Sequence, residues 1–292
     1  MQYHITHTTL YTYSHAVLLQ PHLLRLRPRS DGWQTLEQFE LTIFPEPLAQ
    51  SPITDLDGNA TIKLWFAPEP SHHLKIITTS QVTTHLDNPF IYLLEPWVLQ
   101  LPMDYPSALA AQLQPYWLNP PGSPAIDPAV VQLAQEVLLA SDGAVIEFLT
   151  LLNQRIYQEC HYQIRETGHA YPPGITWREK KGSCRDFTLL FIATCRAIGL
   201  AARFVSGYQE GDVDTEDRSL HAWAEVYLPG AGWRGYDPTH GLLVSDRHIA
   251  LAASPDPRST LPIEGQVKNF GNTAIHQVQT TLTHDLQLTI QT

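Results

Sequence analysis

Two cysteines lie eleven residues apart in the stretch KGSCRDFTLLFIATCRAIGLAARFVSGY, and one of them is placed for chemistry. Ser183 is a good N-cap residue, and the apolar run after Cys184 predicts a buried helix that ends near Gly199. Cys184 therefore lies in the first turn, where free N–H groups and the helix dipole stabilise an anion. Because the thiolate is the reactive form of cysteine, Cys184 is the candidate nucleophile. The alternative is a small apolar residue that merely starts a helix.

The other two cysteines have structural interpretations. Cys195 falls in the middle of the same helix among apolar neighbours, which makes a thiol inert. Cys160 is followed by His161, but adjacent helical residues point in different directions. Three cysteines are no disulfide framework, and no C-x-x-C pair or H-E-x-x-H helix occurs. We therefore expect neither a metal site nor a cofactor.

A cysteine nucleophile needs an imidazole within reach and a third group that orients the ring. The stretch LHAWAEVYLPGAGWRGYDPTHG predicts a hairpin in which His221 begins the first strand and Asp237 ends the second. If Gly230 and Ala231 centre the turn, residue 224 faces Asp237, so a longer turn or a bulge must close the difference. The other twelve histidines, outside this stretch, have no comparable setting.

Together, GSCRDF…RAIGLAARFVSGY and HAWAEVYLPGAGWRGYDPTHG resemble the bacterial transglutaminase-like family, and the stretch YHITHTTLYTYSHAVLLQPHLLRLRPR resembles its β-rich N-terminal domain. The resemblance implies a papain-like core and a Cys-His-Asp triad of Cys184, His221 and Asp237. Such an enzyme forms a thioester acyl-enzyme from an amide, with the histidine as base and then acid. We favour hydrolysis, as a peptidase or amidase. The alternatives are a protein-glutamine transglutaminase with an amine acceptor and a non-catalytic protein-binding module.

The resemblance also implies an oxyanion held by the backbone N–H of Cys184 and by one further donor, which the sequence does not identify. Tyr162 and Trp177 lie upstream in the right region, and we interpret both as packing residues.

Residues within the motif have simpler interpretations. We expect Asp186 to support the helix N-terminus, Arg185 to pair with an acid or face substrate, and Gly182 to permit a tight backbone. Trp223 and Tyr236 are expected in the core.

The elements that must position these residues predict an α+β fold. Period-two alternation predicts strands over the first hundred residues, and seven prolines between 101 and 128 predict an irregular connection with a short helix at 107–114. Helical spacing follows Asp127, a predicted N-cap, and strands return after the Cys184 helix. The last 27 residues predict two more strands around a turn.

We therefore predict a papain-like transglutaminase core, made of a helical part and an antiparallel sheet, with an N-terminal β-rich, sandwich-like domain. The predicted division is 1–102 for the N-terminal domain, 103–127 for the Pro-rich connection, 128–250 for the catalytic core and 251–292 for a β-stranded C-terminal tail. We expect the tail to pack on the N-terminal domain.

Composition limits the partners. The 292 residues carry a formal net charge of -11 with only 18 lysines and arginines, and no basic stripe occurs, which argues against nucleic acid and anionic membranes. No run of 18 apolar residues and no signal-peptide pattern are present. We expect a cytoplasmic protein that acts on a protein or peptide substrate, with docking by the N-terminal domain as a hypothesis. The sequence does not indicate an oligomeric state.

Overall fold

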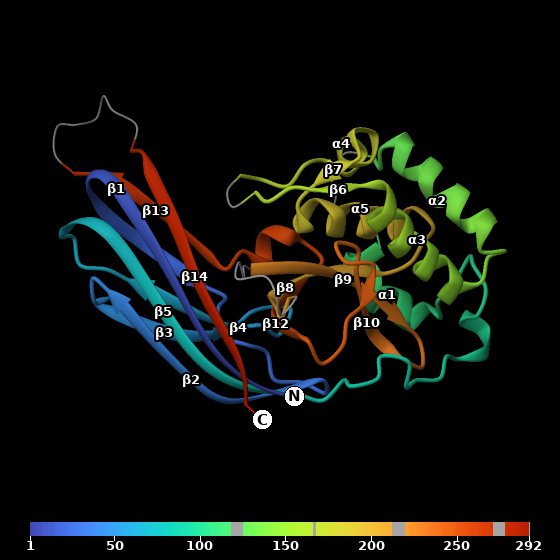
Figure 1. The fold of residues 1–292 in the computed structure, drawn as a ribbon, viewed down its shortest axis with the longest axis horizontal. Helices are drawn as coiled ribbons and strands as arrows, with labels where there is room; N and C mark the ends of the chain where they lie inside the picture. The colour runs from blue at the N-terminus through green and yellow to red at the C-terminus, as the bar shows by residue number, and fades with distance from the viewer. Residues whose placement is uncertain (118–124, 166–167, 212–219, 271–277, 292) are drawn as a thin grey trace.

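The computed structural model describes residues 1–117, 125–165, 168–211, 220–270 and 278–291, and its two main sheets lie side by side (Figure 1). The first sheet has the strand order β2-β5-β1-β4-β3, and two late strands, β13 and β14, pair with β1. All its pairings are antiparallel. Its strands are β1 (Gln2–Leu24), β2 (Gln34–Phe44), β3 (Ala49–Thr54), β4 (Ala60–Trp65), β5 (Pro70–Thr84), β13 (Ile263–Asn269) and β14 (Thr280–Gln291).

This sheet forms because burial alternates along its strands, as the period-two pattern predicts. Tyr3 and Ile5 of β1 are buried while their neighbours are partly exposed. The buried face shares one apolar cluster with Tyr208, Ile249 and Leu251 of the second sheet. The expected sandwich-like region is therefore one seven-stranded sheet packed against the core. The two predicted C-terminal strands are confirmed, and both belong to this sheet.

The core combines an antiparallel five-stranded sheet, ordered β11-β10-β9-β8-β12, with helices. Helix α5 packs on β8 and β9 (Figure 1). The core strands are β8 (Ala202–Gln209), β9 (Leu220–Leu228), β10 (Gly232–Asp237), β11 (Leu242–Leu243) and β12 (His248–Ser254), and a separate parallel pair is β6 (His161–Tyr162) with β7 (Lys181–Gly182). The helices are η1 (Pro96–Val98), α1 (Ser107–Trp117), α2 (Pro128–Ala140), α3 (Val145–Glu159), α4 (Pro173–Glu179), α5 (Cys184–Ala197) and η2 (Pro257–Thr260).

Several local predictions are confirmed. The carboxylate of Asp127 caps α2 by accepting the backbone N–H of Ala129 at 2.9 Å. The short helix expected in the Pro-rich connection is α1, which extends to Trp117 and contains Pro115. Part of the connection, residues 118–124, lies outside the described residues.

Two side-chain amides join the N-terminal sheet to strand β12. The amide of Gln34 donates to the carbonyl of Ala250 and accepts its N–H, at 3.0 and 2.7 Å. Asn59 makes the same pair of bonds with Ala253, each 2.9 Å long, and is fully buried. Strand β12 continues to Ser254, so the core sheet extends past residue 250. These bonds fix the edge strand of the core against the N-terminal sheet.

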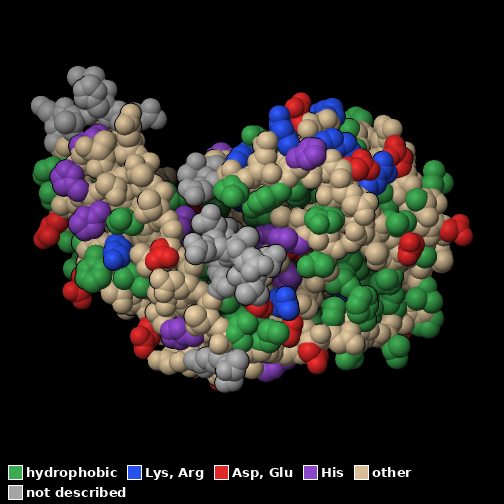
Figure 2. Space-filling model, viewed as in Figure 1, with side chains coloured by type: hydrophobic (Ala, Val, Ile, Leu, Met, Phe, Trp, Pro, Cys, Tyr) green, Lys and Arg blue, Asp and Glu red, His purple; other side chains and the backbone are tan. Residues whose placement is uncertain are grey.

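The surface carries both signs of charge. Over the helical end of the face in Figure 2, acidic and basic side chains are mixed. Among the described residues, no helix combines the length and the apolar character that crossing a membrane requires.

Candidate active site

Helix α5 begins at Cys184, with Ser183 as its N-cap residue, as predicted. Cys184 is a free thiol with 8% of its surface exposed, at the end of the helix where backbone N–H groups are unpaired. The two other cysteines are in different settings. Cys195 is fully buried and burial raises its pKa, and burial also raises the pKa of Cys160 to about 11. Both settings favour the neutral thiol, which is unreactive.

Asp186 holds the start of α5 through several hydrogen bonds, in addition to the interaction of its charge with the helix dipole. Its fully buried carboxylate accepts the N–H and the hydroxyl of Ser183, at 2.7 and 2.9 Å. The same carboxylate accepts Arg165 at 2.9 Å and the backbone N–H of Tyr171 at 2.6 Å. Gly182 is required here because a Cβ would lie 2.7 Å from the Cβ of Asp186.

Arg185 pairs with backbone carbonyls and with no acid among the described residues. Its guanidinium donates to the carbonyls of Gly168 and Arg165, at 2.9 and 2.7 Å. Together with Asp186, it ties the segment that precedes α4 to the start of α5.

The turn of the β9–β10 hairpin explains how His221 reaches Asp237, which a two-residue turn would not allow. Its turn spans three residues, 229–231, and pairs Leu228 with Gly232. Continuing that register brings Trp223, instead of residue 224, opposite Asp237. Side chains two residues apart share a face of a strand, so His221 becomes the diagonal neighbour of Asp237. The longer turn is thus the feature that brings ring and carboxylate together.

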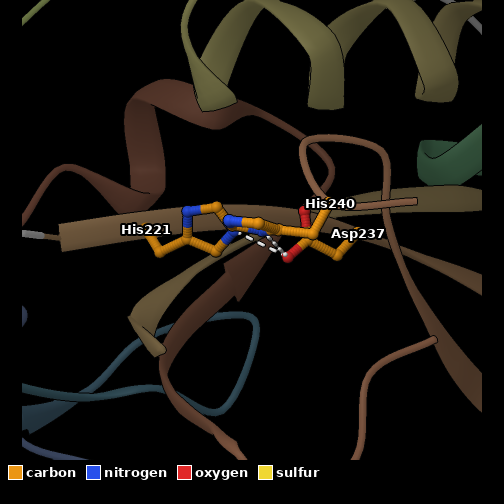
Figure 3. A group of neighbouring side chains, drawn as sticks. All are labelled: His221, Asp237 and His240. Carbon is orange, nitrogen blue, oxygen red and sulfur yellow. Dashed lines mark hydrogen bonds and ion pairs between the residues drawn. The ribbon is translucent and has the colours of Figure 1, made fainter. Parts of the chain in front are cut away.

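Three imidazole rings converge on one oxygen of Asp237 (Figure 3 draws two of them). Oδ2 accepts Nε2–H of His221 at 2.8 Å, Nδ1–H of His240 at 2.9 Å and Nε2–H of His248 at 3.3 Å. Oδ1 accepts the backbone N–H of Thr239 at 3.0 Å. A carboxylate only accepts, so each ring must carry its proton on the nitrogen that faces Asp237. Nδ1 of His221 is then the nitrogen available to the thiol.

The pKa values of His221, Asp237 and His248 follow from this arrangement. Burial alone would lower the pKa of His221, but the charge of Asp237 and hydrogen bonds to Asp237 and Cys184 raise it to about 10. Burial would raise the pKa of Asp237, yet His221 and the three imidazole bonds hold it well below its ordinary value. Burial lowers the pKa of His248 despite its bond to Asp237. His248 therefore stays neutral, with Nδ1 accepting the N–H of Ser245 at 3.4 Å.

The site includes a potential ligand set for a metal ion. The ligand atoms of His221, Asp237 and His240 all lie within 4.8 Å of one another, the one such group found among the described residues. Two imidazoles and a carboxylate suit zinc. A cation there would replace the protons on His221 and His240, and would break the bonds that orient His221.

Tyr162 packs on a core ring, as expected, since its ring meets that of Phe187 edge-on with centroids 6.4 Å apart, but it is also partly exposed. Its side chain is 47% exposed, and strand pairing of β6 with β7 places it level with Gly182, two residues before Cys184. Burial and the charges of Cys184 and Asp237 raise the pKa of its hydroxyl to about 12. The hydroxyl therefore keeps its proton and remains a donor in the neighbourhood of these charges. Trp177 and Tyr236 pack in the main apolar core, as expected. Trp223 is buried in a smaller cluster with Val205 and Ala253.

Sequence reasoning missed two of the three rings. His240 lies three residues after Asp237 within the hairpin motif, and this spacing could have identified it. His248 carries no local signal, because it reaches Asp237 only through the position of β12 in the sheet.

The chain matches two family models. Residues 3–83 match the bacterial transglutaminase-like N-terminal region, and residues 131–238 match the transglutaminase-like superfamily. The second match contains the cysteine, the histidine and the aspartate described above.

Individual proteins agree with these matches. An uncharacterized protein of Mycobacterium tuberculosis is 33% identical over 90% of this chain and 87% of its own length. A protein-glutamine gamma-glutamyltransferase of Pseudomonas aeruginosa is 34% identical over 68 residues, which are 21% of this chain and 10% of that protein. The crystal structure of a "Putative Cysteine Protease" from Cytophaga hutchinsonii superposes with a TM-score of 0.71 at 19% identity, covering 99% of this chain and 90% of that one.

Proposed function

Because the chain belongs to the transglutaminase-like superfamily, we propose that it is a cysteine-dependent enzyme that cleaves amide bonds through an acyl-enzyme. The observation that carries the proposal is the buried pair of His221 and Asp237, 2.8 Å apart, with Cys184 near enough to help raise the pKa of His221. A nucleophile, a base and a group that orients the base are the parts that this chemistry needs. In this proposal, Cys184 is the nucleophile, His221 the acid and base, and Asp237 the orienting residue.

The reaction starts from a proton shared between thiol and ring. With the proton on Nδ1 of His221, the sulfur of Cys184 is a thiolate, which attacks the amide carbonyl carbon. The carbon–nitrogen bond breaks as Nδ1 donates its proton to the leaving amine or ammonia, and a thioester remains. Nδ1 then removes a proton from water, whose oxygen attacks the thioester. The carbon–sulfur bond breaks, and a carboxylic acid leaves.

The oxyanion of the tetrahedral intermediates needs hydrogen-bond donors. We assign the backbone N–H of Cys184, at the first position of α5, as one donor. We assign the hydroxyl of Tyr162 as the second, because the charge of Cys184 acts on it and its raised pKa keeps it protonated. This role adds to the packing of the Tyr162 ring on Phe187.

Hydrolysis is the proposed outcome, because water is the default acceptor of an acyl group. Protein-glutamine transglutamination is the second candidate, which the short match to the Pseudomonas aeruginosa glutamyltransferase favours. In that case an amine attacks the same thioester and a new amide forms. The substrate we propose is a protein or a peptide. Three free cysteines fit a reducing compartment, and a cytoplasmic location is part of the proposal.

Two experiments test the proposal. The first labels the protein with iodoacetamide from pH 4 to 9 and maps the labelled peptides, for the native chain and for His221→Ala. We expect Cys184 to react well below pH 8, Cys160 and Cys195 to stay protected, and the variant to lose the low-pH reactivity. If Cys184 reacts no faster than the two buried cysteines, the result would contradict the proposed enzymatic function and favour a non-catalytic binding module.

The second experiment separates hydrolysis from transfer. A glutamine-containing protein is incubated with the enzyme and a fluorescent primary amine, and released ammonia, new carboxylates and incorporated amine are measured. Hydrolysis predicts peptide cleavage or ammonia release without incorporation. Incorporation that saturates with amine concentration would instead establish the transglutaminase. A Cys184→Ala chain serves as the background in both assays.

A further inference from the structure

A cavity between the N-terminal sheet and the core contains a buried cation that has no counter-charge among the described residues. The cation is Arg234 of β10, whose side chain is only 7% exposed. Its guanidinium carbon lies 4.5 Å from the ring centroid of Trp33 and 4.5 Å from that of Tyr92. Trp33 belongs to the N-terminal region, and Tyr92 to the segment that runs from β5 along the core to α1 (Figure 1). Three separate parts of the chain thus meet at this guanidinium.

The hydrogen-bonding capacity of Arg234 is mostly unused. Nε and Nη1 are both buried and have no partner among the described residues, while Nη2 donates only a long 3.4 Å bond to the carbonyl of Ile91. The indole N–H of Trp223, which lines the same cavity, is also buried without a partner there. Native structures leave few buried donors unpaired, so three around one cavity indicate a bound polar species.

The charges around the cavity favour an anion. Two acidic residues line it, but each is already engaged with an arginine of its own. Glu225 accepts Arg203 at 2.7 Å, and Asp31 accepts Arg29 at 3.4 Å. No carboxylate of the described chain lies within 4 Å of Arg234. A buried charge without a partner is costly, and an anion would offset that cost.

The size of the cavity limits the species. Its volume is about 40 Å³, which is room for about three water molecules on this measure. Drug-sized ligands need about 300 Å³ or more. A planar guanidinium pairs well with a carboxylate of two oxygens, and an ion of the size of formate fills the available volume.

We propose that this cavity is a binding site for a small monovalent anion of the carboxylate or halide class, held by Arg234 and the indole N–H of Trp223. The site is separate from the thiol, and its test requires no enzymatic activity. His248, which donates to Asp237, lines the same cavity, so the bound anion lies beside a ring that supports the active site.

Thermal unfolding in formate tests the site. The melting temperature is recorded from 1 to 100 mM sodium formate for the native chain, for Arg234→Gln and for Arg27→Gln. Arg27 is a matched control, because its guanidinium also stacks on an aromatic ring, that of Phe39, but it is exposed. General salt effects act on all three chains and cancel in the comparison.

We expect 100 mM formate to raise the melting temperature of the native chain and of Arg27→Gln by about 3 °C or more beyond any rise in Arg234→Gln. Benzoate, which exceeds the cavity, should give no such difference. Equal shifts in all three chains would overturn the proposal, and so would a loss of the shift in Arg27→Gln alone.

A second measurement uses the native chain only, in case Arg234→Gln does not fold. Crystals are soaked in sodium bromide, and anomalous scattering locates the bromide ions. The proposal requires a peak in contact with the guanidinium of Arg234. Data with bromide elsewhere but no peak in this cavity would overturn it.

Discussion

The substitution Asp237→Asn tests the whole site, because one carboxylate oxygen holds three imidazole rings. An asparagine amide has the same shape, but one of its two positions is an NH₂ donor. If that donor replaces Oδ2, it faces three imidazole N–H groups. If it replaces Oδ1, it faces the backbone N–H of Thr239. In either orientation, the NH₂ group faces other N–H donors at a fully buried position. The substitution also removes the negative charge.

The size of the effect follows from His221. Its pKa rises from 6.5 to about 10 in the folded chain, which corresponds to roughly 5 kcal/mol at about 1.36 kcal/mol per pKa unit. Cys184 contributes part of this shift, so we expect Asp237→Asn to cost about 3–5 kcal/mol of unfolding free energy, the usual loss when one partner of a buried ion pair is removed. The stabilisation is complete below pH 6.5 and disappears as the pH rises through about 10. Urea unfolding at pH 6 therefore measures it in full.

Without the carboxylate, burial keeps the pKa of His221 at or below 6.5, and the proton no longer stays on the ring. An unpaired thiol with the ordinary pKa of about 8.5 is only about 0.3% thiolate at pH 6. Relative to the native chain, in which the proposal makes Cys184 a thiolate, labelling with iodoacetamide at pH 6 should therefore slow by about 300-fold. Asp127→Asn, which removes a carboxylate from the cap of α2, should leave the rate unchanged. A rate within threefold of native in Asp237→Asn would refute the reasoning.

Three further outcomes are expected. The kcat/KM for amide cleavage should fall as the pH rises through about 10, where His221 loses the proton that the leaving group needs; a fall near pH 7 would contradict the raised pKa. Tyr162→Phe should lower kcat by about 100-fold with KM and the labelling of Cys184 unchanged, and an unaltered kcat would exclude the hydroxyl as an oxyanion donor. Gly182→Ala should destabilise the fold by about 1–3 kcal/mol in urea unfolding, since its Cβ would meet that of Asp186, and native stability would disprove the close contact.

The parts of the site that the sequence predicted are governed by local interactions. A Ser-Cys pair before an apolar run specifies the start of a helix, whatever lies around it. The β9–β10 hairpin is likewise specified by local features, which are alternating residues and a Gly-rich turn. The helix that starts at Cys184 and the strands that carry His221 and Asp237 were therefore predictable. The family resemblance then connected the three residues.

The remaining parts depend on long-range contacts. The length of the turn decides which residue faces Asp237, and its three-residue form was not evident from its composition. His248 joins the site because β12 pairs with β8, a contact that no pattern near residue 248 indicates. The same holds for Tyr162, which the pairing of β6 with β7 brings level with Gly182, near the start of α5.

The position of β12 also changes the role expected for the N-terminal region. The sequence suggested that this region docks substrate, and a deletion of residues 1–100 would seem to test that. In the structure, however, Gln34 and Asn59 hold the backbone of the strand that carries His248. The deletion would free β12 and disturb the support of Asp237, so lost turnover would not demonstrate docking. A docking role must therefore be tested by substitutions on the exposed face of the N-terminal sheet, with both amide contacts left in place.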